Sequence, residues 1–426
     1  MVKKRLPLLF VLILSLSMVL VACGPDREGK TKDGGTSDDS SEVEKPEKLL
    51  VWADENKAEG IKDAVKAFEE KHGIKIKVKE LEMASKQKEQ LRLDGPAGTG
   101  PDVLTLPHDQ IGLLAKEGLL APIDVKQSVL DIYTDSSIDA VTYEGDVYGV
   151  PKATETPVLF YNKELLKEAP KTFEELYTFS KKFTKDGKYG FLALWDNYYF
   201  AHGILASYGA YVFENNDGTL DTSSIGLNNE GAIKGAKFIE KWYDEGLFPQ
   251  GIVGENGGSA LTGLFEGGKA AATMQGPWAV QGMKDAGIDF GVSPMPKLPN
   301  GEYAKTFVGV KSWNVSSYSE HKEWATKLIV WLANEKNSKE RFKIVNEIPP
   351  VKSLINDPVI EDNPVAKAVA IQSQRGVPMP NIPEMGKVWE PMATSLQLIV
   401  TDKQEPEDAL NNAVESIKTK IKANNN

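Results

Sequence analysis

Aromatic and acidic residues stand at the ends of several strand-like segments of this sequence. Trp52 ends an apolar run and is followed by Asp54, Asp109 comes shortly after a second such run, and Glu155 follows a third. Trp278 closes a Gly-rich, weakly apolar stretch. Flat aromatic rings cover apolar ligand faces, while carboxylates accept hydrogen bonds from hydroxyl groups. These residue types can therefore bind a neutral polar molecule without breaking any bond in it.

Each of these residues also has a purely structural interpretation. Trp52, Trp278 or Trp389 could be an ordinary core or surface aromatic residue. Asp109 could be the N-cap of a helix that starts at Ile111. The carboxylate of Glu155 could be satisfied within its own loop. Residue type alone leaves both interpretations open.

The segments around these residues alternate between strand and helix patterns. Residues 48–53, 74–78 and 101–106 are short apolar or alternating runs typical of strands. Between these runs, residues 61–68 and 85–93 have the pattern typical of helices. This rhythm predicts the α/β class, with a parallel sheet covered by helices. Ligands of such sheets bind beyond the carboxyl ends of the strands, which is where the residues described above lie.

The N-terminus has the pattern of a secretory signal. Lys3, Lys4 and Arg5 precede an apolar run that stops at Leu20-Val21-Ala22-Cys23. This tetrapeptide resembles the bacterial lipobox, in which the cysteine becomes the first mature residue and carries lipid. Residues 1–22 are therefore expected to be a lipoprotein signal peptide, and Cys23 the lipidation site. An ordinary signal peptide with an incidental cysteine is the alternative.

The next segment, 23–46, is rich in Gly, Ser, Asp, Glu and Lys and has almost no large apolar residues. It cannot bury enough surface to fold, so we expect a disordered tether behind the lipidated cysteine. Cys23 is the only cysteine, which excludes an intramolecular disulfide. The predicted location is the extracytoplasmic face of the cell membrane, with the lipid anchor as the only membrane contact.

The remaining length and the charge narrow the function. About 380 residues follow the tether, which is enough for two domains. Loss of residues 1–22 removes three positive charges and changes the formal net charge from −11 to −14. This acidic balance argues against nucleic acid as a partner.

Metal and phosphate motifs are missing from the sequence. His72, His108, His202 and His321 are scattered without metal-ligand spacing. The stretch 95–100 contains glycines but precedes a strand and lacks the Lys-Ser/Thr ending of a phosphate loop. We therefore expect no metal and no cofactor.

Several longer motifs share one order along the chain and resemble the maltose/maltodextrin-binding proteins, which belong to the extracellular solute-binding proteins of ABC sugar transporters. The matching motifs are KLLVWADENK, GPDVLTLPHDQIGLLAKEGLLAPI, AVTYEGDVYGVPKATETPVLFYNKELL, LFEGGKAAATMQGPWAV and MPNIPEM. The combination of GPW with MPNIP is more specific than any single residue.

The resemblance implies the periplasmic-binding-protein-like fold, in which two α/β lobes are joined by a hinge of crossing strands and enclose a ligand cleft. Crossings are expected near 153–158, 304–307 and 358–364. The implied N-terminal lobe comprises residues 47–154 plus 307–360. The implied C-terminal lobe comprises residues 157–304 plus 363–422.

The resemblance also implies a set of ligand-binding positions. Aromatic side chains would cover sugar faces, and charged side chains would bind sugar hydroxyls. The matching positions are Trp52, Lys57, Asp109, Glu155, Tyr199, Trp278 and Trp389.

Four potential sugar contacts depart from the best-known pattern of this family. Leu106 and Gln110 replace a Trp and an Arg, and Glu390 and Ala393 replace a Tyr and an Arg. These changes affect the expected length or identity of the sugar. Trp313 has no counterpart in the family, and we expect it to be buried in a lobe rather than to form a substitute platform.

The expected function is the capture of maltooligosaccharides outside the membrane and their delivery, through hinge closure, to the permease of an ABC importer. The chain would act as a monomer and would not be an enzyme. Two alternatives stay open. One is the same role for a different oligosaccharide, and the other is a surface-anchored glycosidase with two cleft carboxylates.

Overall fold

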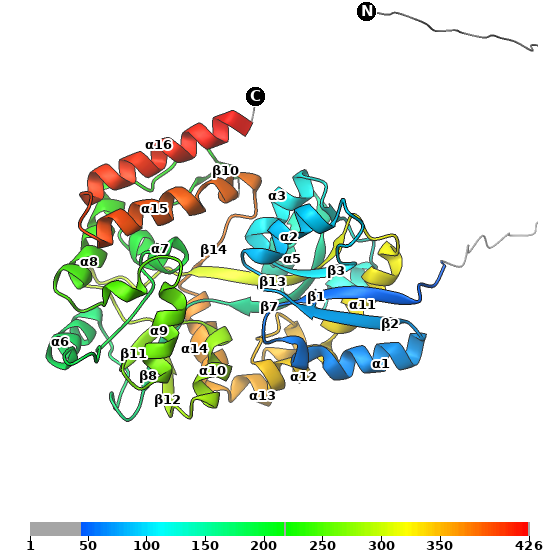
Figure 1. The fold of residues 1–426 in the computed structure, drawn as a ribbon, viewed down its shortest axis with the longest axis horizontal. Helices are drawn as coiled ribbons and strands as arrows, with labels where there is room; N and C mark the ends of the chain where they lie inside the picture. Colours follow the sequence, from blue (N-terminus) through cyan, green and yellow to red (C-terminus); the bar gives the residue numbers. More distant parts are fainter. Residues whose placement is uncertain (1–43, 217–218, 425–426) are drawn as a thin grey trace, which may run out of the picture. The chain divides into compact units, whose positions relative to one another are not determined.

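Two separate sheets organise the chain in the computed structural model, which describes residues 44–216 and 219–424 (Figure 1). The predicted signal peptide, Cys23 and nearly all of the predicted tether lie outside the described residues. Within the described ranges, no helix combines the length and apolar character that a bilayer span requires. Residues 44–426 group together as one compact unit.

The first sheet begins with the predicted parallel strands. Strand β1 (Lys48–Ala53) pairs in parallel with β2 (Lys75–Glu80) on one side and with β3 (Val103–Pro107) on the other. Helix α1 (Lys62–His72) connects β1 to β2 and ends at Gly73, whose φ of 63° favours glycine. These elements confirm the predicted β-α-β order.

Strand β13 (Phe307–Ser316) returns to this sheet from late in the sequence. It pairs antiparallel with β3, with β4 (Leu120–Ala121) and with β7 (Gly149–Glu155). Its first residues also pair in parallel with β14 (Val377–Pro378). In Figure 1, β13 is the yellow strand that leads from the green elements to the cyan ones. The first sheet is therefore assembled from segments far apart in the sequence.

The second sheet is smaller. Strand β8 (Val158–Asn162) lies between β11 (Ala272–Gln275) and β12 (Phe290–Ser293), and both pairs are antiparallel. The predicted parallel pairing therefore holds among β1, β2 and β3, whereas the antiparallel strand β13 makes the first sheet mixed and the second sheet is entirely antiparallel. Two short hairpins are separate from both sheets: β5 (Thr142–Tyr143) with β6 (Asp146–Val147), and β9 (Glu214–Asn216) with β10 (Thr219–Asp221).

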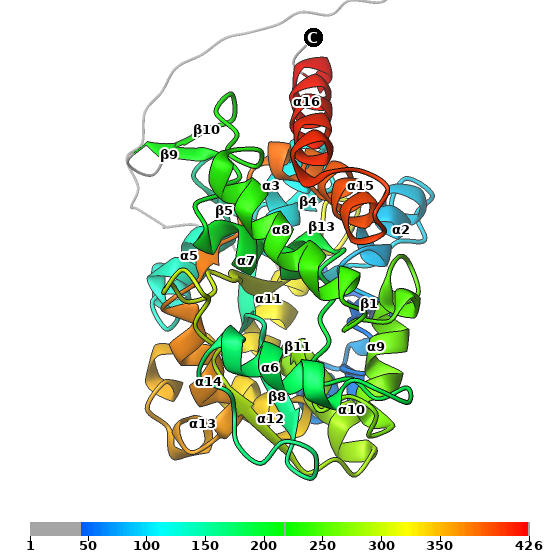
Figure 2. The ribbon, with the colours of Figure 1, turned by 90° about the vertical axis from the view of Figure 1, so that its left-hand side faces the viewer.

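The helices surround these sheets. Figure 2 shows α8 (Glu230–Asp244) near α7 (Tyr198–Ser207) and α16 (Pro406–Asn424), and α8 contacts both of these helices. The other described α-helices are α2 (Lys86–Asp94), α3 (Ile111–Lys116), α4 (Gln127–Leu130), α5 (Asp135–Ala140), α6 (Phe173–Phe183), α9 (Gly257–Glu266), α10 (Val280–Asp285), α11 (Lys322–Ala333), α12 (Glu335–Val345), α13 (Pro358–Glu361), α14 (Pro364–Ser373) and α15 (Trp389–Val400).

Each sheet has its own hydrophobic core. Val51 and Val315 belong to a core built on the first sheet, whereas Phe160 and Met274 belong to a larger core built on the second. A smaller third cluster around Trp52 and Leu104 also packs on the first sheet. Burial of apolar surface is the main stabilising term in folding, so each sheet is stabilised by apolar packing of its own.

The chain passes between the two cores where crossings were predicted. Residues 156–157 connect β7 of the first sheet to β8 of the second. The hydroxyl of Thr156 lies 2.7 Å from that of Thr306 and donates to the Phe307 carbonyl at 2.8 Å, so the first two crossings are adjacent. In the third region Ile360 packs in the first core and Val369 in the second. The lobe boundaries themselves stay a prediction.

Candidate ligand-binding site

Charged side chains gather at the carboxyl ends of β1 and β3. Asp54 directly follows β1, and Asp109 lies in the 3-10 turn His108–Gln110 directly after β3. Glu155 is the last residue of β7, and Lys311 of β13 pairs with Pro107 and Ala153 in the sheet register. Because β1, β3 and β7 run in the same direction, their last residues reach the same edge of the sheet. The antiparallel pairing of β13 with β3 and β7 brings Lys311 to this edge, although it is 257 positions from Asp54.

Lys311 is the centre of this charged group. Its Nζ lies 2.8 Å from Glu155 Oε2 and 3.8 Å from Asp54 Oδ2, and the lysine is only 4% exposed. Burial alone would lower the pKa of Lys311, but Glu155 and Asp54 outweigh it and raise the pKa above its ordinary value. Burial raises the pKa of Glu155, and the charge of Lys311 opposes that shift.

Lys57 lines the same cavity as Lys311 and Glu155. Its Nζ donates to the Val345 carbonyl at 3.3 Å, and its side chain is buried. Burial lowers the pKa of Lys57, and nearby Glu347 partly offsets the effect. Asn56 has a φ of 60°, a left-handed conformation that asparagine tolerates, and it turns the chain before Lys57.

Asp109 is buried and contacts an aromatic residue from the C-terminal part of the chain. Trp389 Nε1–H donates to Asp109 Oδ2 at 3.2 Å. Burial raises the pKa of Asp109 to about 6, against the opposing charge of Lys88. Asp109 is not a helix N-cap, because α3 starts at Ile111 and its N-cap residue is Gln110.

The neighbouring His108 fixes the turn that holds Asp109. Its Nδ1 accepts a hydrogen bond from the Val310 amide at 3.1 Å, and its Nε2–H donates to the Met379 carbonyl at 3.0 Å. Both ring nitrogens are therefore used by a neutral imidazole. Burial lowers the pKa of His108 to about 4, which keeps this arrangement intact at neutral pH.

The other side of the site is aromatic. Ring centroids of Tyr199 and Trp278 are 6.1 Å apart, those of Tyr199 and Phe307 are 6.3 Å apart, and those of Phe307 and Trp389 are 5.8 Å apart. Trp278 Nε1–H donates to Gln275 Oε1 at 2.9 Å, which fixes the orientation of this indole. Three residues predicted from sequence, at 199, 278 and 389, thus form one aromatic cluster together with Phe307.

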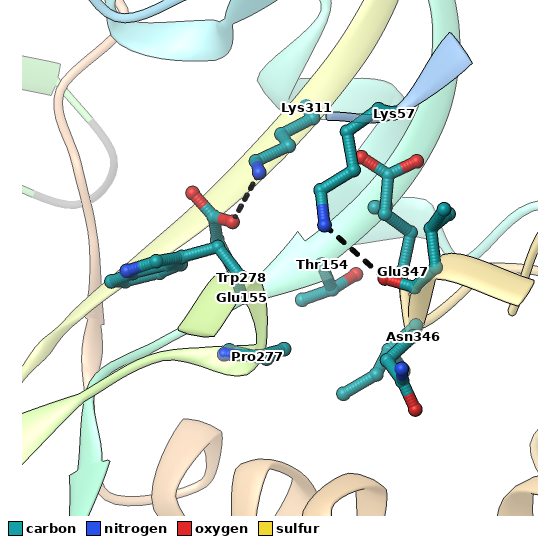
Figure 3. Close-up of a pocket in the computed structure, with 11 residues that line it drawn as sticks. Lys57, Thr154, Glu155, Pro277, Trp278, Lys311, Asn346 and Glu347 are labelled. Atoms are coloured by element: carbon teal, nitrogen blue, oxygen red, sulfur yellow. Dashed lines mark hydrogen bonds and ion pairs between the residues drawn. The ribbon is translucent and has the colours of Figure 1, made fainter. Parts of the chain in front are cut away.

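A small cavity is lined by Lys57, Glu155 and Lys311 from the charged side and by Trp278 from the aromatic side (Figure 3). Asp109, Tyr199 and Trp389 do not line it. Glu155 and Lys311 point toward each other beside Trp278, while Lys57 approaches from the side of Glu347. The cavity has a volume of about 10 Å³. A water molecule needs roughly this much space, whereas small-molecule sites measure about 300–1,000 Å³. Elements lining the site must therefore separate before an oligosaccharide can enter this cavity.

Trp52 occupies a different environment from the other aromatic residues. Its ring is fully buried in a cluster with Leu104 and Leu106, and Lys79 Nζ lies 5.2 Å from its centre. It does not line the cavity. The geometry favours a packing role in this conformation, and the assignment of Trp52 as a ligand-binding residue stays a prediction. Trp313 is buried in the first core, as we expected.

The four departures from the family pattern have separate surroundings. Leu106 is fully buried, and the Gln110 side-chain amide donates to the Ala84 carbonyl. Glu390 is exposed and forms an ion pair with Lys420. Ala393 is partly exposed. Two of these positions are therefore engaged by the chain itself, one through a hydrogen bond and one through an ion pair.

Sequence reasoning missed a second buried charge group beside the site. Glu347 lies 2.9 Å from Lys152 Nζ and 3.2 Å from Arg341 Nε, and all three residues are almost fully buried. Burial would raise the pKa of Glu347, but Lys152, Lys311 and Arg341 lower it to about 2. A lysine inside a strand of mostly small and apolar residues, as at Lys152 and Lys311, is the signal that could have indicated these groups.

Most of the chain matches a known protein family. Residues 63–368 match the family described as bacterial extracellular solute-binding protein. The chain belongs to this family. The description of the family is that of a binding protein and names no reaction.

Similar full-length proteins are known from two bacteria. The galactooligosaccharide-binding protein of Bacillus subtilis is 50% identical over 97% of this chain and 97% of its own length. The maltodextrin-binding protein MdxE of the same organism is 36% identical over 96% of this chain and 95% of its own. A maltooligosaccharide ABC transporter solute-binding lipoprotein of Streptococcus pneumoniae is 35% identical over 95% of both chains. The predicted resemblance to maltodextrin-binding proteins is confirmed.

Solved structures of this solute-binding family give the same result for the fold. A cyclo/maltodextrin-binding protein complexed with maltotetraose is 43% identical, with a TM-score of 0.75 over 89% of this chain and 98% of that one. MalX from Streptococcus pneumoniae, in complex with maltopentaose, is 34% identical, with a TM-score of 0.82 over 87% of this chain and 100% of that one. These matches confirm the predicted two-lobe α/β fold class.

Proposed function

We propose that this chain is the oligosaccharide-binding component of an ABC sugar importer. Charged and aromatic side chains lie next to each other in the candidate site, and the proposal rests on this arrangement. The buried groups of Asp109 and Lys311 and the partly buried carboxylate of Glu155 lie beside the aromatic cluster of Tyr199, Trp278 and Trp389, and a hydrogen bond joins Trp389 to Asp109. A sugar has apolar C–H faces and a rim of hydroxyls, so it needs both kinds of contact.

Maltooligosaccharides are the first candidate ligands. Their binding is supported by the names of two relatives and by the maltotetraose and maltopentaose complexes of similar structures. A micromolar complex corresponds to about 8 kcal/mol. A few hydrogen bonds to charged groups, at roughly 1.5–3 kcal/mol each, together with ring stacking can supply this after ordering costs.

Galactooligosaccharides are the second candidate. The relative with 50% identity carries this ligand in its name, and its match spans nearly the full length of both chains. Gln110 and Glu390 also occupy positions where maltodextrin-binding proteins often have other residues, and in this chain both bind partners of their own. Galactose and glucose units differ in hydroxyl orientation, so the hydrogen-bonding side of the site would distinguish them.

Ligand capture would proceed by closure of the two lobes. Asp109 and Trp389 contact each other directly, so an incoming sugar must replace or rearrange this contact. Closure is then a population shift that is driven by contacts made only in the closed state. A permease outside this chain would recognise the closed form, and the chain itself would act as a monomer without catalysis.

Isothermal titration tests the proposal, and residues 44–426 can be used because they form a compact unit. The ligands are maltose, maltotriose, maltopentaose, a cyclodextrin, galactobiose and galactotriose. Tighter binding of the maltose series supports the first candidate, and tighter binding of the galactose series supports the second. Chromatography of the incubated sugars must show no shorter products, because cleavage would point to a glycosidase. If no oligosaccharide binds, the proposal is wrong.

The lipid anchor is part of the proposal and is tested separately. Two relatives are named lipoproteins, which supports the assignment of residues 1–22 as a signal peptide and of Cys23 as the lipidated residue. Expression of the full chain in a bacterium fed labelled palmitate should label the membrane fraction. Cys23→Ser should abolish the label and release the protein, whereas a labelled Cys23→Ser protein would contradict the assignment. Two acyl chains are needed for stable anchoring.

A further inference from the structure

Lys311 lies in the interior of a buried strand, whereas Glu155 ends its strand and Asp54 follows one. It is the only charged residue of β13, and the strand residues on both sides of it are also buried. A buried ammonium is costly unless a charged partner compensates it. The lysine therefore depends on the carboxylates that face it, and they depend on the lysine.

The ammonium of Lys311 contacts both sides of the site. It is 2.8 Å from Glu155 Oε2 and 3.8 Å from Asp54 Oδ2 at the charged edge. It also lies 5.9 Å from the centre of the Trp278 ring on the aromatic side, within the range of a cation–π contact. Lys311 and these neighbours Glu155 and Trp278 line the same cavity (Figure 3).

We propose that Lys311 is a positioning and ligand-binding residue of the ligand site. It holds the Glu155 carboxylate ionised and directed toward the ligand, and a remaining N–H of its ammonium binds a ligand oxygen at the edge of Trp278. An ammonium has three N–H donors, and the contact with Glu155 uses one of them. The ligand part of this inference rests on the proposed function, whereas the effect on Glu155 does not.

The neighbouring lysines cannot replace Lys311. Lys57 donates to the Val345 carbonyl, and Lys152 pairs with Glu347 and does not line the cavity. Removal of Lys311 would therefore leave Glu155 buried without its nearest cation. The other titratable or charged groups that act on Glu155 or on Lys311 are Asp54, Lys57, Asp109, Lys152, Tyr199 and Glu347.

The consequence is a change in proton binding. With Lys311 present, its charge opposes the effect of burial on Glu155, which burial alone pushes toward the neutral acid. Without Lys311, burial and the negative charges of Asp54 and Glu347 act together, and Glu155 should take up a proton at a higher pH. A neutral Glu155 has one acceptor fewer for a sugar hydroxyl.

The experiment compares Lys311→Met and Lys311→Arg with the unchanged protein and with Lys152→Met, a matched loss of a buried lysine outside the cavity. Circular dichroism first confirms that each variant is folded. Carbon NMR of side-chain-labelled glutamate then follows the titration of Glu155 without ligand, with Glu155→Gln as the assignment control. Isothermal titration with maltotriose and galactotriose between pH 5 and 8 follows binding.

We expect the Glu155 carboxyl to titrate at higher pH in Lys311→Met but not in Lys311→Arg. We also expect sugar affinity to fall at least about tenfold at pH 7.5 in Lys311→Met, with a further fall toward pH 5. An unchanged Glu155 titration in Lys311→Met overturns the inference even if no sugar binds. Equal loss of affinity in Lys152→Met, with the same pH profile, overturns it as well. Failure of the unchanged protein to bind sugar contradicts only the proposed function.

Discussion

The charged and aromatic sides of the candidate site are held in place in different ways. At the charged edge, Lys311 is compensated by Glu155 and Asp54, and Glu347 compensates Lys152 and Arg341. On the aromatic side, the rings pack against one another and against the second core, and packing of this kind is non-directional. Charges fix orientation but depend on one or two specific partners, whereas aromatic surfaces supply area and tolerate changes in partner.

The largest effect is expected on stability, from a change in the buried charge group of Glu347, Lys152 and Arg341. Glu347→Gln should lower the free energy of unfolding by about 3–5 kcal/mol, because Lys152 and Arg341 would be left buried without their partner. Urea unfolding measures the change. The matched control is Glu340→Gln, which removes an exposed pair with Lys343 and should cost about 0–1 kcal/mol. Equal effects of the two substitutions would mean that Glu347 is not the compensating partner.

The next largest effect concerns ligand binding at the charged edge. Asp109→Ala should weaken binding of the preferred oligosaccharide by about 1.5–3 kcal/mol, or roughly 10- to 150-fold, because a charged hydrogen-bond acceptor is lost. Isothermal titration of residues 44–426 measures the loss. Asp289→Ala, which removes an exposed partner of Lys163, is the control and should leave affinity unchanged. If Asp109→Ala binds the oligosaccharide with unchanged affinity, Asp109 is not a ligand-binding residue.

A smaller effect follows from pH. Because burial raises the pKa of Asp109 to about 6, this carboxyl becomes mostly protonated below that pH and loses acceptor capacity. Affinity should therefore fall by up to about tenfold from pH 7.5 to pH 5. Asp109→Asn, which has no titrating group, should flatten this part of the profile. A profile that is equally steep in Asp109→Asn would assign the effect to another group.

The same shift has a defined sign for stability. Since the pKa of Asp109 is higher in the folded chain than its ordinary value of 3.8, the folded state holds this proton more tightly than the unfolded state. The contribution of Asp109 to stability is therefore largest at low pH and is lost as pH rises from about 4 to about 6. Urea unfolding of Asp109→Asn across this range should lack that decline, while a decline identical to that of the unchanged protein would contradict it.

The smallest effect is expected on the aromatic side. Trp278→Leu keeps an apolar side chain but removes the flat ring, and it should weaken binding by about 0.5–1.5 kcal/mol, or roughly 2- to 12-fold. Titration with the same oligosaccharide measures it, with Trp324→Leu as a control, because Trp324 packs against the first core and does not line the cavity. A loss larger than that of Asp109→Ala would reverse the comparison between the two sides.

Much of the fold could be predicted because its signals are local. The alternating and apolar runs around β1, β2 and β3 and the stop at Gly73 are properties of neighbouring residues. The antiparallel second sheet could not be predicted from them, because β8 pairs with strands more than 100 residues later in the chain. Strand pairing over such distances has no local signal.

The candidate site divides in the same way. The resemblance to the maltodextrin-binding proteins brought Asp109, Glu155, Tyr199, Trp278 and Trp389 into one hypothesis, and direct contacts connect these residues into one region of the structure. Trp52 belongs to the same sequence pattern but is enclosed by leucines. Nothing in its neighbouring residues distinguishes a buried ring from an accessible one, because burial depends on what the rest of the chain places above it.

The sequence by itself determined the chemistry available to this protein: aromatic rings, carboxylates and lysines at strand ends, and a family pattern that spans most of the chain. Only the tertiary structure decided which charges meet. Lys311 and Asp54 are 257 positions apart, and their pairing depends on β13 returning beside β3 in an antiparallel register. The physical reason is that electrostatic interactions and burial depend on distance in space, which the fold sets, and not on separation along the chain.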